Sequence, residues 1–167
     1  LPLKVFAHNV ECVPRLDRTV RDSRASFQQS LRILEQAKIL RPDILTKTSI
    51  MVGLGEGDEE VEEALRMIHD ARVDMVTIGQ YLQPSYKHLP VDRFPEPERF
   101  ADWDEVAREI GFGAVASGPL VRSSYRAGML WDEAMAGEPE VTRDSTGSAV
   151  SHLISGEEII TARGQMS

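Results

Sequence analysis

Residues 46–60, TKTSIMVGLGEGDEE, predict a strand, a glycine turn and a helix in immediate succession. The apolar run 50–52 ends at Gly53, which is typical of a strand buried on both faces of a parallel sheet. Glycines at 53, 55 and 57 permit close backbone approach, and the acidic residues 58–60 complement the positive end of a helix that begins there. Such a loop lies at the carboxyl end of the sheet, where α/β proteins bind ligands. A tight connection with no ligand explains the glycines equally well.

Strand and helix patterns alternate on both sides of this stretch. A short strand is predicted at 3–6, and a helix is predicted at 26–40, where apolar residues repeat at helical spacing ahead of Pro42. After the helix that follows residue 60, the pattern predicts a buried strand at 74–79, a helix at 98–110 and a last strand at 114–116. Residues 14–23 and the proline-containing segment 84–97 are predicted loops. The alternation indicates an α/β fold with a parallel sheet.

Polar residues follow the predicted strands at several points. Asn9 and Glu11 come after the first strand and would share one face of an extended chain. The turn 53–56, the pair Gln80 and Gln83, and the segment 117–125 follow the later strands. Because parallel strands end at one edge of a sheet, these groups predict the rim of an active site for a small molecule. Solvated strand ends are the alternative, and these residue types do not identify a reaction.

Composition excludes several classes of protein. A net charge of −8 with dispersed Lys and Arg argues against nonspecific binding of nucleic acid. No apolar run is long enough for a membrane span and the first residues lack a secretory pattern, so we expect a cytosolic protein with no membrane partner. The single cysteine, Cys12, excludes an internal disulfide and any multi-cysteine site built from this chain alone. Because the sequence starts at Leu1 in a strand-like run, we expect the N-terminal part of a longer protein to be missing.

Four segments resemble lipoyl synthases in the same order and at compatible spacing: HNVECVPRL (8–16), IMVGLGEGDEE (50–60), IGQYLQPSYKHLPVDRF (78–94) and ASGPLVRSSYRAG (116–128). Lipoyl synthases are radical S-adenosylmethionine (SAM) enzymes that insert two sulfur atoms into an octanoyl group on a lipoyl-carrier protein or E2 lipoyl domain. The resemblance implies the C-terminal half of a partial TIM-like radical SAM barrel in residues 1–128. Residues 129–167 are expected to form a loosely ordered extension.

The resemblance also implies SAM and two [4Fe-4S] clusters as cofactors. One cluster, held by a C-x-x-x-C-x-x-C motif, cleaves SAM, and the auxiliary cluster, held by three other cysteines and a serine, supplies sulfur. By position in the matching segments, the implied cofactor-binding residues are Asn9, Glu11, Gly53, Gly55, Glu56, Gln80 and Gln83. The implied substrate-side residues are Lys87, His88 and Arg122.

Ser124, in the segment RSSY, is the iron ligand that the resemblance implies. A serine pair that caps a chain reversal is the alternative reading. The individual roles of Gln80, Gln83, Lys87 and His88 stay open, and no residue is assigned as catalytic.

The sequence departs from the family because both cysteine motifs are absent. Cys12 stands where threonine is usual, so it does not replace a cluster ligand. We therefore expect the chain to be inactive without the missing N-terminal half of the enzyme. A non-catalytic module or degenerate paralogue that binds SAM or the carrier protein is the second hypothesis, and cysteine triplets just upstream of Leu1 would argue against it. An unrelated phosphate-binding barrel fragment would explain the glycine turn but not RSSY.

Overall fold

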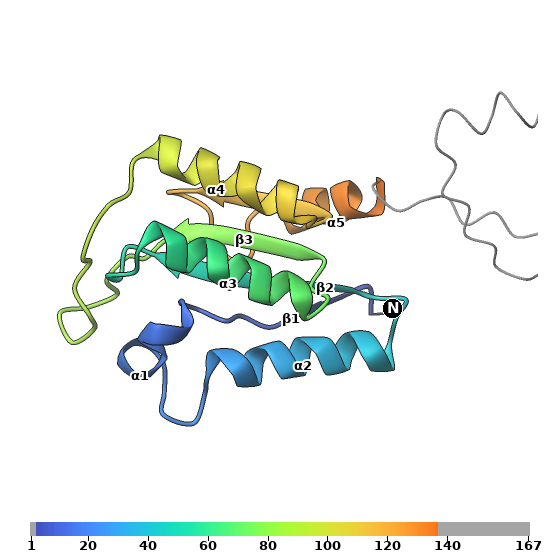
Figure 1. The fold of residues 1–167 in the computed structure, drawn as a ribbon, viewed down its shortest axis with the longest axis horizontal. Coiled ribbons are helices and arrows are strands. Elements are labelled where there is room, and N and C mark those ends of the chain that lie inside the picture. The colour runs from blue at the N-terminus through green and yellow to red at the C-terminus, as the bar shows by residue number, and fades with distance from the viewer. Residues whose placement is uncertain (1–2, 137–167) are drawn as a thin grey trace, which may run out of the picture. The chain divides into compact units, whose positions relative to one another are not determined.

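Four parallel strands form one sheet in the order in which they occur in the chain (Figure 1). They are β1 (Val5–Ala7), β2 (Leu45–Val52), β3 (Met75–Gln80) and β4 (Ala114–Gly118). The structure is a computed structural model and describes residues 3–136. A helical connection joins each strand to the next, as parallel pairing requires. The predicted α/β fold is confirmed, and the arrangement is consistent with part of a TIM-like barrel.

Three helices cover one face of the sheet: α2 (Phe27–Leu40), α3 (Asp58–Asp70) and α4 (Pro97–Ile110) (Figure 1). Their apolar stripes pack against alternate residues of the strands, such as Ile50 and Ile78, to form the larger core. Trp103 and Phe27 are among its largest fully buried side chains. Burial of one such side chain contributes roughly 1.5–3 kcal/mol. Because the larger core lies on this face, the face supplies most of the apolar stabilisation of the sheet.

Local sequence signals set the ends of these helices. The Ser26 hydroxyl caps α2 by accepting a hydrogen bond from the Gln29 amide at 3.1 Å. The predicted start of α3 is confirmed, and the Glu60 carboxylate accepts from the Gly57 amide at 2.8 Å. Gly111 ends α4 with a φ of 119°, a left-handed conformation that glycine adopts without strain.

Helix α5 (Ala127–Ala136) covers the amino end of the opposite face. Its residues Leu130 and Ala134 pack against the first residues of three strands, which are Leu45, Met75 and Ala114. The predicted boundary between residues 128 and 129 falls inside this helix, so residues 129–136 are helical rather than loosely ordered. Residues 137–167 lie outside the described part of the chain. The division into a barrel half and an extension stays a prediction.

The segment 14–23 contains two helical turns, so the prediction of a loop is wrong there. They are η1 (Pro14–Leu16) and α1 (Asp17–Val20), which are too short to show an apolar period. The Asp17 carboxylate accepts a hydrogen bond from the Phe27 amide at 2.7 Å. The turns are therefore attached to the start of α2.

Candidate functional site

A cleft of about 250 Å³ lies at the carboxyl end of the sheet. Its lining residues Ser49 and Gly79 alternate along their strands with residues of the larger core, so the cleft faces away from α2, α3 and α4. The segment after β1, the strands β2 and β3, and the turn after β4 all contribute to its walls. The lining residues are Asn9, Glu11, Ser49, Ile50, Met51, Gly79, Gln80, Leu82, Val121, Arg122 and Ser123. The structure thus brings together Asn9, Glu11, Gln80 and Arg122 of the predicted rim.

Hydrogen bonds to β2 fix the chain around Glu11. Its amide donates to the Ser49 carbonyl at 3.2 Å, and its own carbonyl accepts from the Met51 amide at 2.8 Å. The φ of Glu11 is 70°, in the left-handed region that a residue with a side chain seldom adopts. Glu11 and Asn9 both line the cleft, as their predicted shared face requires.

The glycine turn after β2 lies outside the lining of this cleft. The buried Glu56 carboxylate accepts hydrogen bonds from the amides of Gly53 at 2.7 Å and Leu54 at 2.9 Å. Gly53 and Gly55 have φ values of 95° and 107°. A Cβ on Gly53 would lie 2.5 Å from the Arg93 carbonyl oxygen. Gly53, Gly55 and Glu56 therefore build the turn itself, and their assignment to a cofactor pocket stays a prediction.

Gln80 ends β3 and lines the cleft. Its Nε2 donates to the carbonyl of Tyr81 at 3.0 Å and to the carbonyl of Arg93 at 3.1 Å. Gln80 is 5% exposed, and its side chain links β3 to the loop that precedes α4. Because both amide protons are engaged, its carbonyl oxygen is the group that can accept a hydrogen bond from a ligand.

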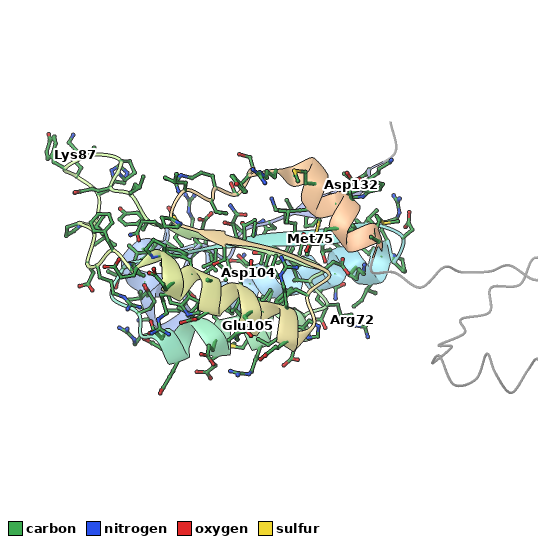
Figure 2. The ribbon with its side chains drawn as sticks, turned by 90° about the horizontal axis from the view of Figure 1, so that it is seen from above. Arg72, Met75, Lys87, Asp104, Glu105 and Asp132 are labelled. Carbon is green, nitrogen blue, oxygen red and sulfur yellow. The ribbon has the colours of Figure 1, made fainter. Side chains whose placement is uncertain are left out.

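Gln83, Lys87 and His88 form a separate group in the loop between β3 and α4. Gln83 Nε2 donates to the His88 carbonyl at 2.8 Å, and His88 Nδ1 lies 2.9 Å from the Ser85 hydroxyl. Figure 2 shows Lys87 at the tip of this loop, well away from Met75 at the start of β3. Lys87 and His88 line a second hollow of about 460 Å³, with Thr19, Val20, Met51, Tyr81, Pro84, Leu89 and Pro90. The structure does not bring this group into the first cleft.

The RSSY segment forms a turn after β4. The Tyr125 amide donates to the Arg122 carbonyl at 2.8 Å, and Arg122 Nη1 donates to the Val121 carbonyl at 2.9 Å. Arg122 and Ser123 line the cleft, whereas Ser124 is exposed and lies outside its lining. The assignment of Ser124 as a metal ligand stays a prediction.

Lys47 and Ser49 are two polar residues of β2 that were not predicted to belong to the site. The Lys47 ammonium donates to the Ser123 carbonyl. Lys47 is 5% exposed, and this burial lowers the pKa of its ammonium from the usual value of 10.5. The period-two alternation in TKTSIMV places positions 47, 49 and 51 on one face, and extending the strand back from residue 50 would have found them.

Cys12 is buried and is no ready metal ligand. Burial, with a smaller contribution from the Asp17 carboxylate, raises the pKa of its thiol to about 12. The thiolate, which is the form that binds metal, is therefore disfavoured. Among residues 3–136, no three His, Cys, Asp or Glu side chains gather as metal ligands would.

No family model matches the chain. Curated proteins do match it, with identities of 55–57% for the three named below. Lipoyl synthase, mitochondrial, from Bos taurus is 56% identical over 126 residues, which are 75% of this chain and 34% of that protein. Lipoyl synthase 1, chloroplastic, from Populus trichocarpa is 57% identical over 136 residues, which are 81% of this chain and 36% of that protein. The chain matches a region of lipoyl synthase.

The chain spans about a third of the length of the relatives that it matches. The resemblance seen in the four segments is confirmed, and the Homo sapiens protein, named lipoyl synthase, mitochondrial, is also 55% identical over 126 residues.

The expected cytosolic location is wrong. The relatives are named mitochondrial or chloroplastic. The residues of a barrel carry no targeting pattern of their own, so composition and the lack of a secretory signal could not reveal the compartment. Within residues 3–136, no helix has the length and apolar character needed to cross a membrane.

Proposed function

We propose that this chain supplies part of the active site of a lipoyl synthase, which inserts two sulfur atoms into a protein-bound octanoyl group. The observation that most supports this proposal is the meeting of Asn9, Glu11, Gln80 and Arg122 at one cleft. These residues come from segments that follow or end three different strands of the sheet. The acyl group would arrive on a lipoyl-carrier protein or E2 lipoyl domain.

The polar groups of the cleft suit SAM, which carries hydroxyl groups, an amine and a carboxylate. The Glu11 carboxylate can accept from an amine or a hydroxyl, and the Asn9 amide can both donate and accept. The Arg122 guanidinium can donate to a carboxylate. At about 250 Å³ the cleft is smaller than typical ligand pockets of roughly 300–1,000 Å³. We therefore propose that it is one wall of the SAM pocket and that other segments of the enzyme complete it.

The described residues do not by themselves fit an iron–sulfur cluster. Cys12 is buried with its thiol protonated, and Ser124 offers a single exposed oxygen. In the complete enzyme the auxiliary cluster would supply the sulfur. Ser124 would contribute one oxygen ligand, which binds iron less firmly than a thiolate does. We expect the isolated chain to be inactive because it lacks the cysteines that would hold a cluster.

Three substitutions in the complete enzyme test the role of Ser124. Single-turnover lipoyl formation should fall sharply in Ser124→Ala, while cleavage of SAM, measured alongside, stays close to wild type. Ser124→Cys should also impair turnover, because a thiolate would hold iron more firmly than an oxygen ligand. Ser123→Ala is the matched control and should be the milder change. Wild-type product yield from Ser124→Ala would reject the ligand assignment, and a loss confined to Ser123→Ala would move it by one residue.

A non-catalytic module that binds SAM or a carrier protein is the second candidate, and the single buried cysteine favours it. Anaerobic reconstitution of the 167-residue chain with iron and sulfide should give no stoichiometric cluster absorbance and no SAM cleavage under either proposal. Expression together with the upstream coding sequence separates them. Lipoyl formation would support the enzyme, whereas SAM or carrier binding without product would support the module.

A further inference from the structure

A buried lysine lies where the sheet meets the turn after β4. Lys47 is the third residue of β2 and pairs with Ala7 of β1 and Met75 of β3. Lys47 is 5% exposed, and this burial lowers the pKa of its ammonium. Taking an ammonium out of water is costly unless its donors find acceptors. The position of this lysine therefore requires a specific partner.

That partner is the backbone of the RSSY turn. The Lys47 ammonium donates to the carbonyl of Ser123. Lys47 and Ser123 are far apart in the sequence. Their contact joins the turn after β4 to the face of the sheet opposite α2, α3 and α4. A backbone carbonyl accepts this bond whatever side chain stands at position 123.

Gly79 of β3 leaves the space in which the same turn approaches the sheet. A Cβ on Gly79 would lie 2.2 Å from the Val121 carbonyl oxygen and 3.2 Å from its carbon. Backbone atoms cannot move away from such a contact without moving the turn. Gly79 is absent from the residues with positive φ in the described chain. Space, and not backbone conformation, is what requires glycine at this position.

The hydrogen bonds within the turn are local. The Val121 amide donates to the Gly118 carbonyl at 3.1 Å, and the Tyr125 amide donates to the Arg122 carbonyl at 2.8 Å. These bonds curve the chain but do not attach it to β2 or β3. The bond from Arg122 Nη1 to the Gln80 carbonyl, at 3.5 Å, is at the upper limit of length.

We propose that Lys47 is a positioning residue. Together with the space left by Gly79, it holds the turn of residues 119–125 against the face of the sheet opposite α2, α3 and α4. It acts through the Ser123 carbonyl and so keeps Arg122 and Ser123 at the cleft. Ser124 is the next residue along, so the same contact sets where its hydroxyl lies. The consequence for Ser124 rests on the proposed function, whereas the attachment of the turn to the sheet does not.

Hydrogen exchange followed by mass spectrometry tests, in the 167-residue chain, whether Lys47 holds the turn of residues 119–125 against the sheet. In Lys47→Met, peptides that cover residues 118–126 should exchange about tenfold faster, because the local opening of the turn becomes easier. Lys47→Arg keeps the charge and donors and should restore most of the protection. Thr77→Val is the matched control, since Thr77 is fully buried in the adjacent strand and its hydroxyl has no hydrogen-bond partner in the described structure. It should leave the turn unchanged.

Peptides from α3 report on the fold as a whole. Equal acceleration in α3 and in the turn would show that Lys47 supports general stability and would overturn the proposal, as would unchanged exchange in 118–126. Gly79→Ala provides an independent arm, which should accelerate exchange in the turn while Lys47 is intact. Unchanged turn exchange in this variant would also count against the proposal.

Turnover of the complete enzyme separates this inference from the proposed function. A wild-type enzyme that forms no lipoyl group would reject the proposed function and leave the exchange result standing. A Lys47→Met enzyme with a loosened turn and normal sulfur insertion would reject the link from Lys47 to Ser124.

Discussion

Two turns at the carboxyl end of the same sheet use their polar residues in opposite ways. In the turn after β2, residues 53–57, Glu56 is 4% exposed and its carboxylate accepts hydrogen bonds from two amides of its own turn. In the turn after β4, residues 119–125, Ser124 and Arg122 are exposed, and a lysine from β2 holds the backbone. Both turns follow a parallel strand. The sheet topology therefore does not account for the difference.

The contrast shows that glycines after a strand are weak evidence for a ligand site. In the first turn, Gly53 lets the backbone pass close to the Arg93 carbonyl, and the carboxylate at position 56 satisfies amides that would otherwise be buried without partners. In the second turn, side chains remain accessible to a ligand. Substitutions in the two turns should therefore separate stability from activity.

Glu56→Ala should have the largest effect on stability. It removes the acceptor of the Gly53 and Leu54 amides and a carboxylate that lies 3.7 Å from the Arg93 guanidinium. Leaving these donors unpaired should lower the free energy of unfolding by about 2–4 kcal/mol. Urea denaturation followed by circular dichroism measures the change. A loss below about 1 kcal/mol would contradict the structural role assigned to this turn.

Gly53→Ala should come next and should exceed Gly55→Ala. Both glycines have positive φ, but a Cβ on Gly53 meets backbone at 2.5 Å, whereas the nearest atom to a Cβ on Gly55 is 3.8 Å away on Asp92. We expect a loss of about 2–3 kcal/mol at position 53 and about 1 kcal/mol at position 55. The same denaturation experiment compares them, and equal losses would mean that φ alone governs both positions.

Glu60→Gln should have a smaller effect that depends on pH. Hydrogen bonds from Arg15 and from the Gly57 amide hold the pKa of Glu60 at about 2, below its usual 4.5. A depressed pKa stabilises the fold above pH 4.5, and this contribution is lost as pH falls towards 2. Because the pair is partly exposed, the difference at neutral pH should be at most about 1 kcal/mol. Melting temperatures of wild type and variant should differ above pH 4.5 and converge near pH 2.

Ser124→Ala should have the smallest effect on stability. The side chain is exposed, so the free energy of unfolding should change by less than about 0.5 kcal/mol. Thermal unfolding of the 167-residue chain is the measurement. A large loss would show that the second turn, like the first, depends on its own side chains.

Much of the architecture could be predicted because its signals are local. The apolar spacing in α2, α3 and α4, the cap at Ser26 and the acidic first turn of α3 each act over a few residues. The burial of Thr46 and Lys47 at the beginning of β2 was not predicted, because these residues are polar and find their partners far away in the sequence. The turns at 14–20 were missed because they are too short to show an apolar repeat.

The candidate site could be predicted in part. Asn9 and Glu11 both line the cleft, as predicted, but they follow β1 and Glu11 has a left-handed φ, so strand alternation does not explain their meeting. Whether Glu56 faces a ligand or its own amides depends on how the turn closes, which no spacing rule specifies. The grouping of Gln83 with His88, apart from the cleft, depends likewise on the path of an irregular loop.

The left-handed backbone of Glu11 bears on how this protein can change over evolution. A φ of 70° costs a residue with a side chain of order 1 kcal/mol and would cost glycine almost nothing. Selection for thermal stability alone would therefore favour Gly or Asn at this position. We expect the carboxylate at this position to serve the cleft at the expense of backbone stability. A directed-evolution screen that rewards stability without activity should replace Glu11 early, at the expense of the cleft.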